Sequence, residues 1–109
     1  MAITAVSRWK GKLEDALPIA KEIAPLLKNQ GAVAVRLGYC HSGEYSGQVY
    51  AAIIFPDWAT YGRAMQALSG DAQYQRIFAE ALKIAELQDR SVIVSQDLCS
   101  EFQLPANDS

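Results

Sequence analysis

The stretch GQVYAAIIFPDWATYGRAMQALSG, residues 47–70, decides the fold. Its first part, QVYAAIIF at 48–55, is apolar at every position after Gln48, whereas a strand with one solvated face alternates apolar and polar residues. The pattern therefore predicts a strand that is covered on both faces. Pro56 has no N–H to give to a sheet and ends the strand. Asp57 can then cap a helix, because its side chain can accept hydrogen bonds from the first free amides.

The residues after Asp57 predict a helix that ends near Leu68. Its apolar positions recur at spacings of three or four, which places them on one helical face: Trp58, Tyr61, Met65 and Leu68. Gly70 suits the C-terminal end of this helix. The aromatic residues have two interpretations. They pack in the core, or Trp58 or Tyr61 lines a cavity.

Composition limits the classes of function. The chain has 109 residues, which suits one domain, and half of them are hydrophobic. Ten basic and twelve acidic residues form no cluster, which argues against a nucleic-acid partner or a membrane surface. No apolar run approaches the ~20 residues needed to span a bilayer. Cys40 and Cys99 lack metal-ligand spacing, so we expect a reducing cytoplasm with both thiols packed as small apolar groups, in preference to a disulfide.

The rest of the chain supplies three more strands and two more helices. Alternation predicts strands at 2–9, 32–40 and 91–99, and a 3.6-residue period predicts helices at 13–29 and 72–87. The first helix contains two prolines, each of which removes a hydrogen bond. Its apolar stripe nevertheless continues through both of them, so the helix prediction stands.

The polar, glycine-rich link at 41–47 is too short for a crossover and predicts a hairpin. The order is then β-α-β-β-α-β, with the second crossover split into two helices. Right-handed crossovers place the helices on one face of a four-stranded antiparallel sheet, which is a ferredoxin-like α+β fold. We expect residues 1–104 to form this single domain and residues 105–109 to be a flexible C-terminal tail.

The opposite face of this sheet has no helix to cover it, although both residue sets of the strand at 48–55 are apolar. Large exposed apolar patches are rare on soluble monomers. The simplest cover is a second copy of the chain, packed sheet against sheet with two-fold symmetry. The sequence therefore predicts a homodimer, and a polar substitution at Ile54 should dissociate it if this face is the interface.

The element order over about residues 2–102 resembles the dimeric α/β-barrel superfamily. Two segments carry the resemblance: FPDWATYGRAMQAL at 55–68 and ALSGDAQYQRIFAEALKIAEL at 67–87, which look like the starts of the helices that follow the central hairpin there. The group includes antibiotic-biosynthesis monooxygenases that need no cofactor, heme-degrading monooxygenases, muconolactone-isomerase-like enzymes, stress-responsive barrel proteins and small bacterial members. Heme-degrading members place a histidine on a helix facing heme. Neither predicted helical region here has one, which argues against heme. The lack of a second histidine argues against a histidine-rich metal site, and we expect no cofactor or metal.

Three residues are candidates for catalysis: Arg36, His41 and Tyr50. His41, the only histidine, has the ordinary pKa of a general base, or it is simply an exposed turn residue. Arg36, like Arg8, can bind a carboxylate or enolate. For both arginines the alternatives are an ion pair with Asp97 or Glu101 or a contact between subunits.

Four aromatic residues are candidates for binding a ligand, although packing in the core is the alternative for each of them: Trp9, Tyr39, Trp58 and Tyr61. The first expected function is binding of a small apolar or aromatic molecule by a dimeric barrel. The alternative from the enzyme class is a cofactor-independent monooxygenase or isomerase that acts on an aromatic or polyketide-like substrate, as the resemblance implies. A third is an interaction module without a ligand.

Overall fold

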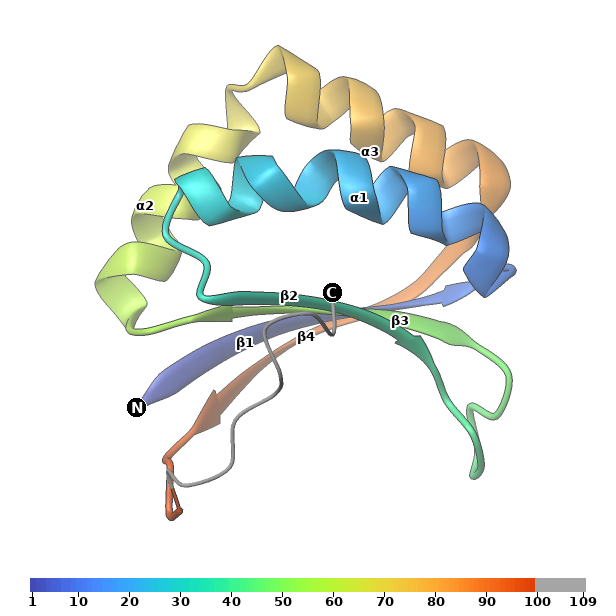
Figure 1. The fold of residues 1–109 in the computed structure, drawn as a ribbon, viewed down its shortest axis with the longest axis horizontal. Helices are drawn as coiled ribbons and strands as arrows, with labels where there is room; N and C mark the ends of the chain where they lie inside the picture. The colour runs from blue at the N-terminus through green and yellow to red at the C-terminus, as the bar shows by residue number, and fades with distance from the viewer. Residues whose placement is uncertain (100–109) are drawn as a thin grey trace.

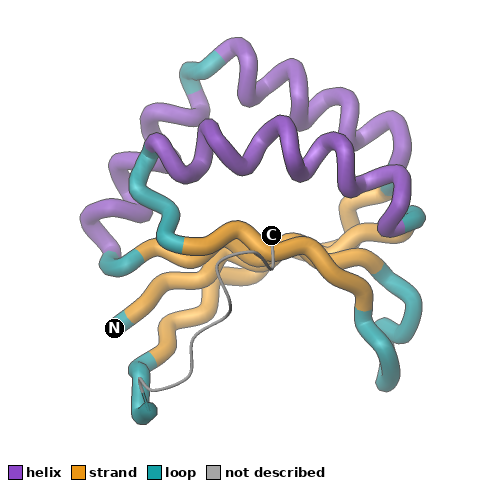
Figure 2. Tube along the Cα trace, in the orientation of Figure 1, coloured by secondary structure: helices purple, strands orange, loops and turns teal. Residues whose placement is uncertain are grey.

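The chain folds as one antiparallel sheet whose helices all cover the same face (Figures 1 and 2). The structure is a computed structural model and describes residues 1–99. Its elements, in order, are β1 (Ala2–Lys10), α1 (Leu13–Asn29), β2 (Ala34–Tyr39), β3 (Val49–Phe55), α2 (Trp58–Ser69), α3 (Ala72–Ile84) and β4 (Glu86–Ser95). The four strands lie in the order β2-β3-β1-β4. This arrangement confirms the predicted ferredoxin-like fold, while the predicted tail at 105–109 lies outside the described residues.

The strand β3 is central because it pairs with both β1 and β2. Val49 and Phe55 at its two ends are buried under the helices, whereas Tyr50 on the other face is 38% exposed. The main core joins the sheet to the helices through six buried residues: Ile3, Leu27, Ala32, Phe55, Ala64 and Leu68. The helical face of β3 is therefore part of the core, and its other face is open to solvent in a single chain.

Aspartates start the two later helices, as the sequence predicts. Asp57 Oδ1 accepts a hydrogen bond of 2.7 Å from the Thr60 amide, and Asp71 Oδ1 accepts one of 2.8 Å from the Tyr74 amide. These bonds satisfy amides that have no partner within the helix. The bonds from Thr60 favour the charged carboxylate and lower the pKa of Asp57. Gly70 follows α2 at its C-terminal end, also as predicted.

Helix α1 runs without interruption through both Pro18 and Pro25. Both prolines are exposed, whereas Leu27 is buried against the sheet. The prolines therefore leave the apolar face of α1 intact. The packing of that face outweighs the hydrogen bonds that the prolines remove.

The prediction of the last strand was wrong in its position. We expected a strand at 91–99 after a helix ending at 87, but α3 ends at Ile84 and β4 begins at Glu86. Leu87 continues the helical spacing of Ile84, which explains the misplacement. In the fold, Leu87 instead pairs with Trp9 at the far end of the long strand β1, beside a register shift. Pairing with β1 decides where β4 lies, and the local period does not.

Both cysteines carry free thiols. Cys40 is partly buried and donates a hydrogen bond of 3.1 Å to the Ser42 carbonyl. Cys99 is exposed, so the expectation that both thiols pack as apolar groups was wrong for Cys99. The reason is that Cys99 lies beyond the end of β4 at Ser95. Within residues 1–99, no helix is long and apolar enough to cross a membrane.

Candidate functional site

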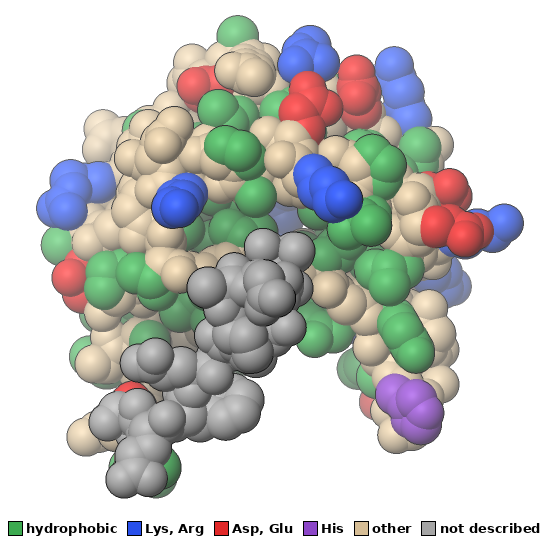
Figure 3. All heavy atoms as spheres, viewed as in Figure 1, with side chains coloured by type: hydrophobic (Ala, Val, Ile, Leu, Met, Phe, Trp, Pro, Cys, Tyr) green, Lys and Arg blue, Asp and Glu red, His purple; other side chains and the backbone are tan. Residues whose placement is uncertain are grey.

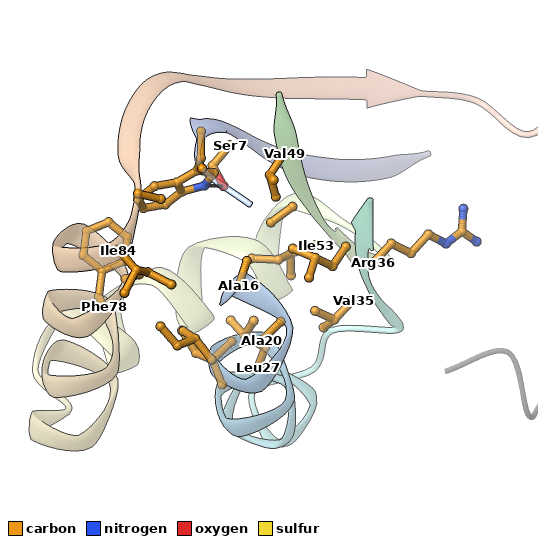
Figure 4. A pocket seen from close by; sticks show the side chains of 18 of the residues that line it. Ser7, Ala16, Ala20, Leu27, Val35, Arg36, Val49, Ile53, Phe78 and Ile84 are labelled. Carbon is orange, nitrogen blue, oxygen red and sulfur yellow. Dashed lines mark hydrogen bonds between the residues drawn. The ribbon is translucent and has the colours of Figure 1, made fainter. Parts of the chain in front are cut away.

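A cavity of about 120 Å³ lies between the sheet and the helices α1 and α3 (Figure 4). The sheet contributes Val49, Ala51 and Ile53 from β3, and α1 contributes Ala16, Ala20 and other small or branched side chains. The small residues on α1 leave part of the space between that helix and the sheet unfilled. The exposed lining residues Gly11, Lys12 and Ile84 mark the opening, where β1 leads into α1 and α3 ends.

One wall of the cavity is aromatic. Trp9 of β1 meets Phe78 of α3 edge to face, with ring centroids 5.8 Å apart, and Phe78 stacks on Tyr74 at 6.3 Å. All three residues line the cavity. Arg90 of β4 lies over the Phe78 ring at 4.8 Å. Burial raises the pKa of Tyr74, and the positive charge of Arg90 partly opposes this. The wall is therefore rigid, apolar and suited to contact with a flat molecule.

Ser7 is a polar side chain in this apolar setting. It projects from β1 into the cavity (Figure 4), and its Oγ accepts a hydrogen bond of 2.8 Å from Trp9 Nε1. Among residues 1–99, no acceptor is found for the Ser7 hydroxyl proton. A serine that already accepts a hydrogen bond is a stronger donor. Ser7 can therefore donate to a molecule in the cavity.

Of the four aromatic residues predicted to bind a ligand, Trp9 lines the cavity and the other three lie elsewhere. Tyr39 and Trp58 are 55% and 50% exposed. Tyr61 packs against the core, with its ring 5.6 Å from that of Phe55 and 5.9 Å from that of Trp58. The core-packing interpretation of Tyr61 therefore agrees with its contacts.

The structure does not bring the three predicted catalytic side chains together. Arg36 borders the cavity, but its side chain points away from it (Figure 4), and its pairing with Ala52 places it on the open face of the sheet, the same face as Tyr50. His41 is exposed in the hairpin link, where its carbonyl accepts a hydrogen bond of 3.0 Å from Ser46 Oγ. Tyr50 lies on the open face of the sheet, beside its partner Gly38. Within residues 1–99, no group of three metal-ligating side chains is found either.

The open face of the sheet changes from apolar to polar along the strands. Strand register places one row of Ile93, Thr4, Ile54 and Ala34 across this face, and a later row of Asp89, Arg8, Tyr50 and Gly38. Arg8 anchors the polar end. Its guanidinium donates a hydrogen bond of 2.7 Å to Gln48 Oε1, lies 3.7 Å from an Asp89 carboxylate oxygen and covers the Tyr45 ring at 3.5 Å.

The partner of Arg8 differs from the two carboxylates that the sequence suggested, Asp97 and Glu101. Because β4 starts earlier than predicted, Asp89 lies opposite Arg8. Glu101 lies outside the described residues. On the face shown in Figure 3, charged side chains of both signs are interspersed over the helical layer, and hydrophobic side chains gather between the helices and the sheet. The face of the molecule in this view therefore carries no large patch of one charge sign.

Sequence reasoning missed Ser7, Tyr74 and Phe78 as site residues. The signals were present but weak. Ser7 shares the alternate set of Trp9 on β1, and Tyr74 and Phe78 are four residues apart on one face of α3. Each also fits an ordinary core position. Only the distance between α1 and the sheet turns these positions into the lining of a cavity.

Comparison with known proteins relates the chain to one family and to several structures. The sequence profile of a family described as "Domain of unknown function (DUF6854)" matches residues 1–95. No curated protein sequence matches the chain.

Three solved structures share the fold. A variant of SnoaB, a cofactor-independent oxygenase from Streptomyces nogalater, is 14% identical with a TM-score of 0.68, over 92% of this chain and 98% of that one. A NIPSNAP domain protein from Burkholderia xenovorans is 19% identical with a TM-score of 0.67, over 91% and 98%. A dimeric ferredoxin-like protein from an uncultured marine organism is 13% identical with a TM-score of 0.63, over 88% and 98%. At these identities the likeness establishes the fold alone, and that fold is the ferredoxin-like arrangement predicted from the sequence.

Proposed function

The chain belongs to the DUF6854 family of domains of unknown function, and from its geometry we propose that it is a homodimer that binds a small apolar or aromatic molecule between its sheet and the helices α1 and α3. The cavity carries this proposal. It is lined by aliphatic and aromatic side chains with few polar groups, which is the usual character of a small-molecule site. A cavity of about 120 Å³ is also much larger than a single water needs.

The dimer forms through the open face of the sheet. Ile93 at the apolar end of this face is 50% exposed, and Tyr50 is 38% exposed. Ile54 on the central strand β3 lies in the same cross-strand row as Ile93, four residues along the strand from Tyr50, and is only partly buried. A second copy would remove this apolar surface from water. The similar structure from a marine organism is described as a dimeric ferredoxin-like protein, which supports the same assembly here.

Two further proposals concern the whole chain. The single domain that we propose extends over residues 1–104, of which the structure describes residues 1–99. The protein works in the cytoplasm, where its two free thiols would stay reduced.

The second candidate function is that of a cofactor-independent monooxygenase or isomerase. Support comes from SnoaB, which has the same fold and is described as a cofactor-independent oxygenase. A reaction inside the cavity would depend on Ser7 and Tyr74, because the side chains of Arg36, His41 and Tyr50 lie outside it. Turnover of a bound phenol with consumption of oxygen would favour this candidate over simple binding.

Binding can be tested with a cavity-filling substitution. Toluene titrated into the labelled protein should shift the amide NMR signals of cavity residues on β3 and α1. Ala20→Leu fills the cavity and should abolish these shifts. Ala79→Leu, which adds the same group at an exposed position of α3, is the matched control and should leave them intact. Equal binding by wild type and the Ala20 variant would contradict the proposed site.

A further inference from the structure

The size of the cavity limits the ligand more sharply than its polarity does. An apolar cavity of about 150 Å³ in another protein accepts benzene and stays free of water. The cavity here is about 120 Å³, so without rearrangement it accommodates one six-membered ring or a chain of similar volume. A fused polycyclic molecule of the polyketide type does not fit this space.

The hydrogen bond between Trp9 and Ser7 fixes where an oxygen atom of the ligand would lie. Ser7 Oγ accepts a hydrogen bond from Trp9 Nε1, with 2.8 Å between the two atoms. The hydroxyl hydrogen of Ser7 therefore points away from Trp9. Trp9 is 8% exposed and packs against Phe78 in the aromatic wall. This packing holds the indole ring, and with it the hydrogen bond to Ser7, in place. A ring that lies against Trp9 and Phe78 would place a substituent beside Ser7.

The charges around the cavity argue against an ionised ligand. Of the residues that line it, the cationic ones are Lys12, which is exposed at the opening, and Arg36, whose side chain points away (Figure 4). A ligand carboxylate beside Ser7 would lose its hydration shell and would have no positively charged side chain next to it. Burying an unpaired charge costs far more than a neutral hydrogen bond returns.

We propose that the ligand is an uncharged, single-ring aromatic compound with one small oxygen substituent, such as a phenol or an aryl aldehyde, whose oxygen accepts a hydrogen bond from the Ser7 hydroxyl. This inference rests on the proposed function of the cavity and deepens it. It assigns Ser7 as the residue that selects oxygen-bearing ligands, and Trp9 as the residue that positions the Ser7 hydroxyl.

Four probes separate the parts of this proposal: toluene, phenol, benzoate and 1-naphthol, each titrated into the full chain and followed by amide NMR shifts. Phenol should bind the wild type roughly three- to tenfold more tightly than toluene, which is the worth of one neutral hydrogen bond. Benzoate and 1-naphthol should bind at least tenfold more weakly than phenol. Binding of 1-naphthol equal to that of phenol would overturn the size argument, and equal binding of benzoate would overturn the charge argument.

Variants of Ser7 test the hydrogen bond itself. Ser7→Ala should still bind toluene but lose the preference for phenol. Ser7→Thr keeps the hydroxyl on a β-branched residue suited to a strand and should retain the preference. A Ser7→Ala variant with the wild-type preference would overturn the role of Ser7, whereas failure of all four probes to bind any variant or the wild type would overturn the proposed function. If Ser7→Ala loses its fold by circular dichroism, Trp9→Phe serves instead and should reduce the phenol preference.

Discussion

The ring of Tyr50 lies directly over the backbone of Gly38, its cross-strand partner on the open face of the sheet. A Cβ atom at Gly38 would come within 2.9 Å of Tyr50 Cε1 and 3.0 Å of the hydroxyl oxygen, closer than side chains pack. The aromatic ring opposite Gly38 therefore disfavours any larger residue at this position, and Gly38 has no positive backbone φ angle that would call for glycine. This contact between β3 and β2 lies on the open face of the sheet, where we place the second subunit.

The effect of Gly38→Ala should consequently depend on Tyr50. In the wild type the new methyl group displaces the ring, and we expect a loss of about 1 kcal/mol of unfolding free energy. In a Tyr50→Ala background the same change should stabilise by roughly 0.5–1 kcal/mol, because glycine inside a strand is unfavourable. Chemical denaturation at one protein concentration measures both values. The same effect of Gly38→Ala in the two backgrounds would show that the ring does not restrict this position.

A charge on the open face should dissociate the proposed dimer. Ile54→Asp would place an unpaired carboxylate within the proposed sheet-to-sheet contact, and sedimentation velocity at micromolar concentration should give the mass of a single chain. Leu82→Asp is the control, because Leu82 is 50% exposed on α3 and lies on the helical side. A wild type that sediments as a single chain would refute the dimer, and a dimeric Ile54 variant would refute this choice of face.

The ionisation of Tyr74 should lower stability at alkaline pH. Burial raises the pKa of Tyr74 above the ordinary tyrosine value of 10.0, so the unfolded chain releases this proton at lower pH than the folded chain. The stabilisation from the neutral phenol is complete below pH 10 and is lost as the pH rises through the folded pKa. Wild-type stability should thus fall more steeply above pH 10 than that of Tyr74→Phe, measured by urea denaturation. Parallel pH profiles would mean that Tyr74 is solvated in the native protein.

The cap of α3 should contribute measurably to stability. Asp71→Ala removes the acceptor for the Tyr74 amide and should cost about 1 kcal/mol of unfolding free energy. Asp71→Asn keeps an acceptor at the same position and should cost much less. Thermal and urea unfolding of the two variants provide the comparison, and equal losses would show that charge, and not the hydrogen bond, is what matters at this position.

Much of the architecture follows from local sequence. The apolar run before Pro56, the capping aspartates Asp57 and Asp71 and the short link at 41–47 each restrict the backbone through nearby atoms alone. These restrictions suffice for the element order, the hairpin and the helical pair. They fail at Glu86–Arg90, because a polar edge strand and the end of a helix look alike until β1 is present to pair with it.

The site shows the opposite balance. The sequence by itself determined that the chain builds a ferredoxin-like sheet with one face under helices. Only the tertiary structure decided that Ser7, Tyr74 and Phe78 meet Trp9 around a cavity, and that the side chains of Arg36, His41 and Tyr50 lie outside it. The physical reason is that periodicity fixes the face on which a side chain lies. The space between two faces depends instead on the summed sizes of side chains from elements far apart in the chain.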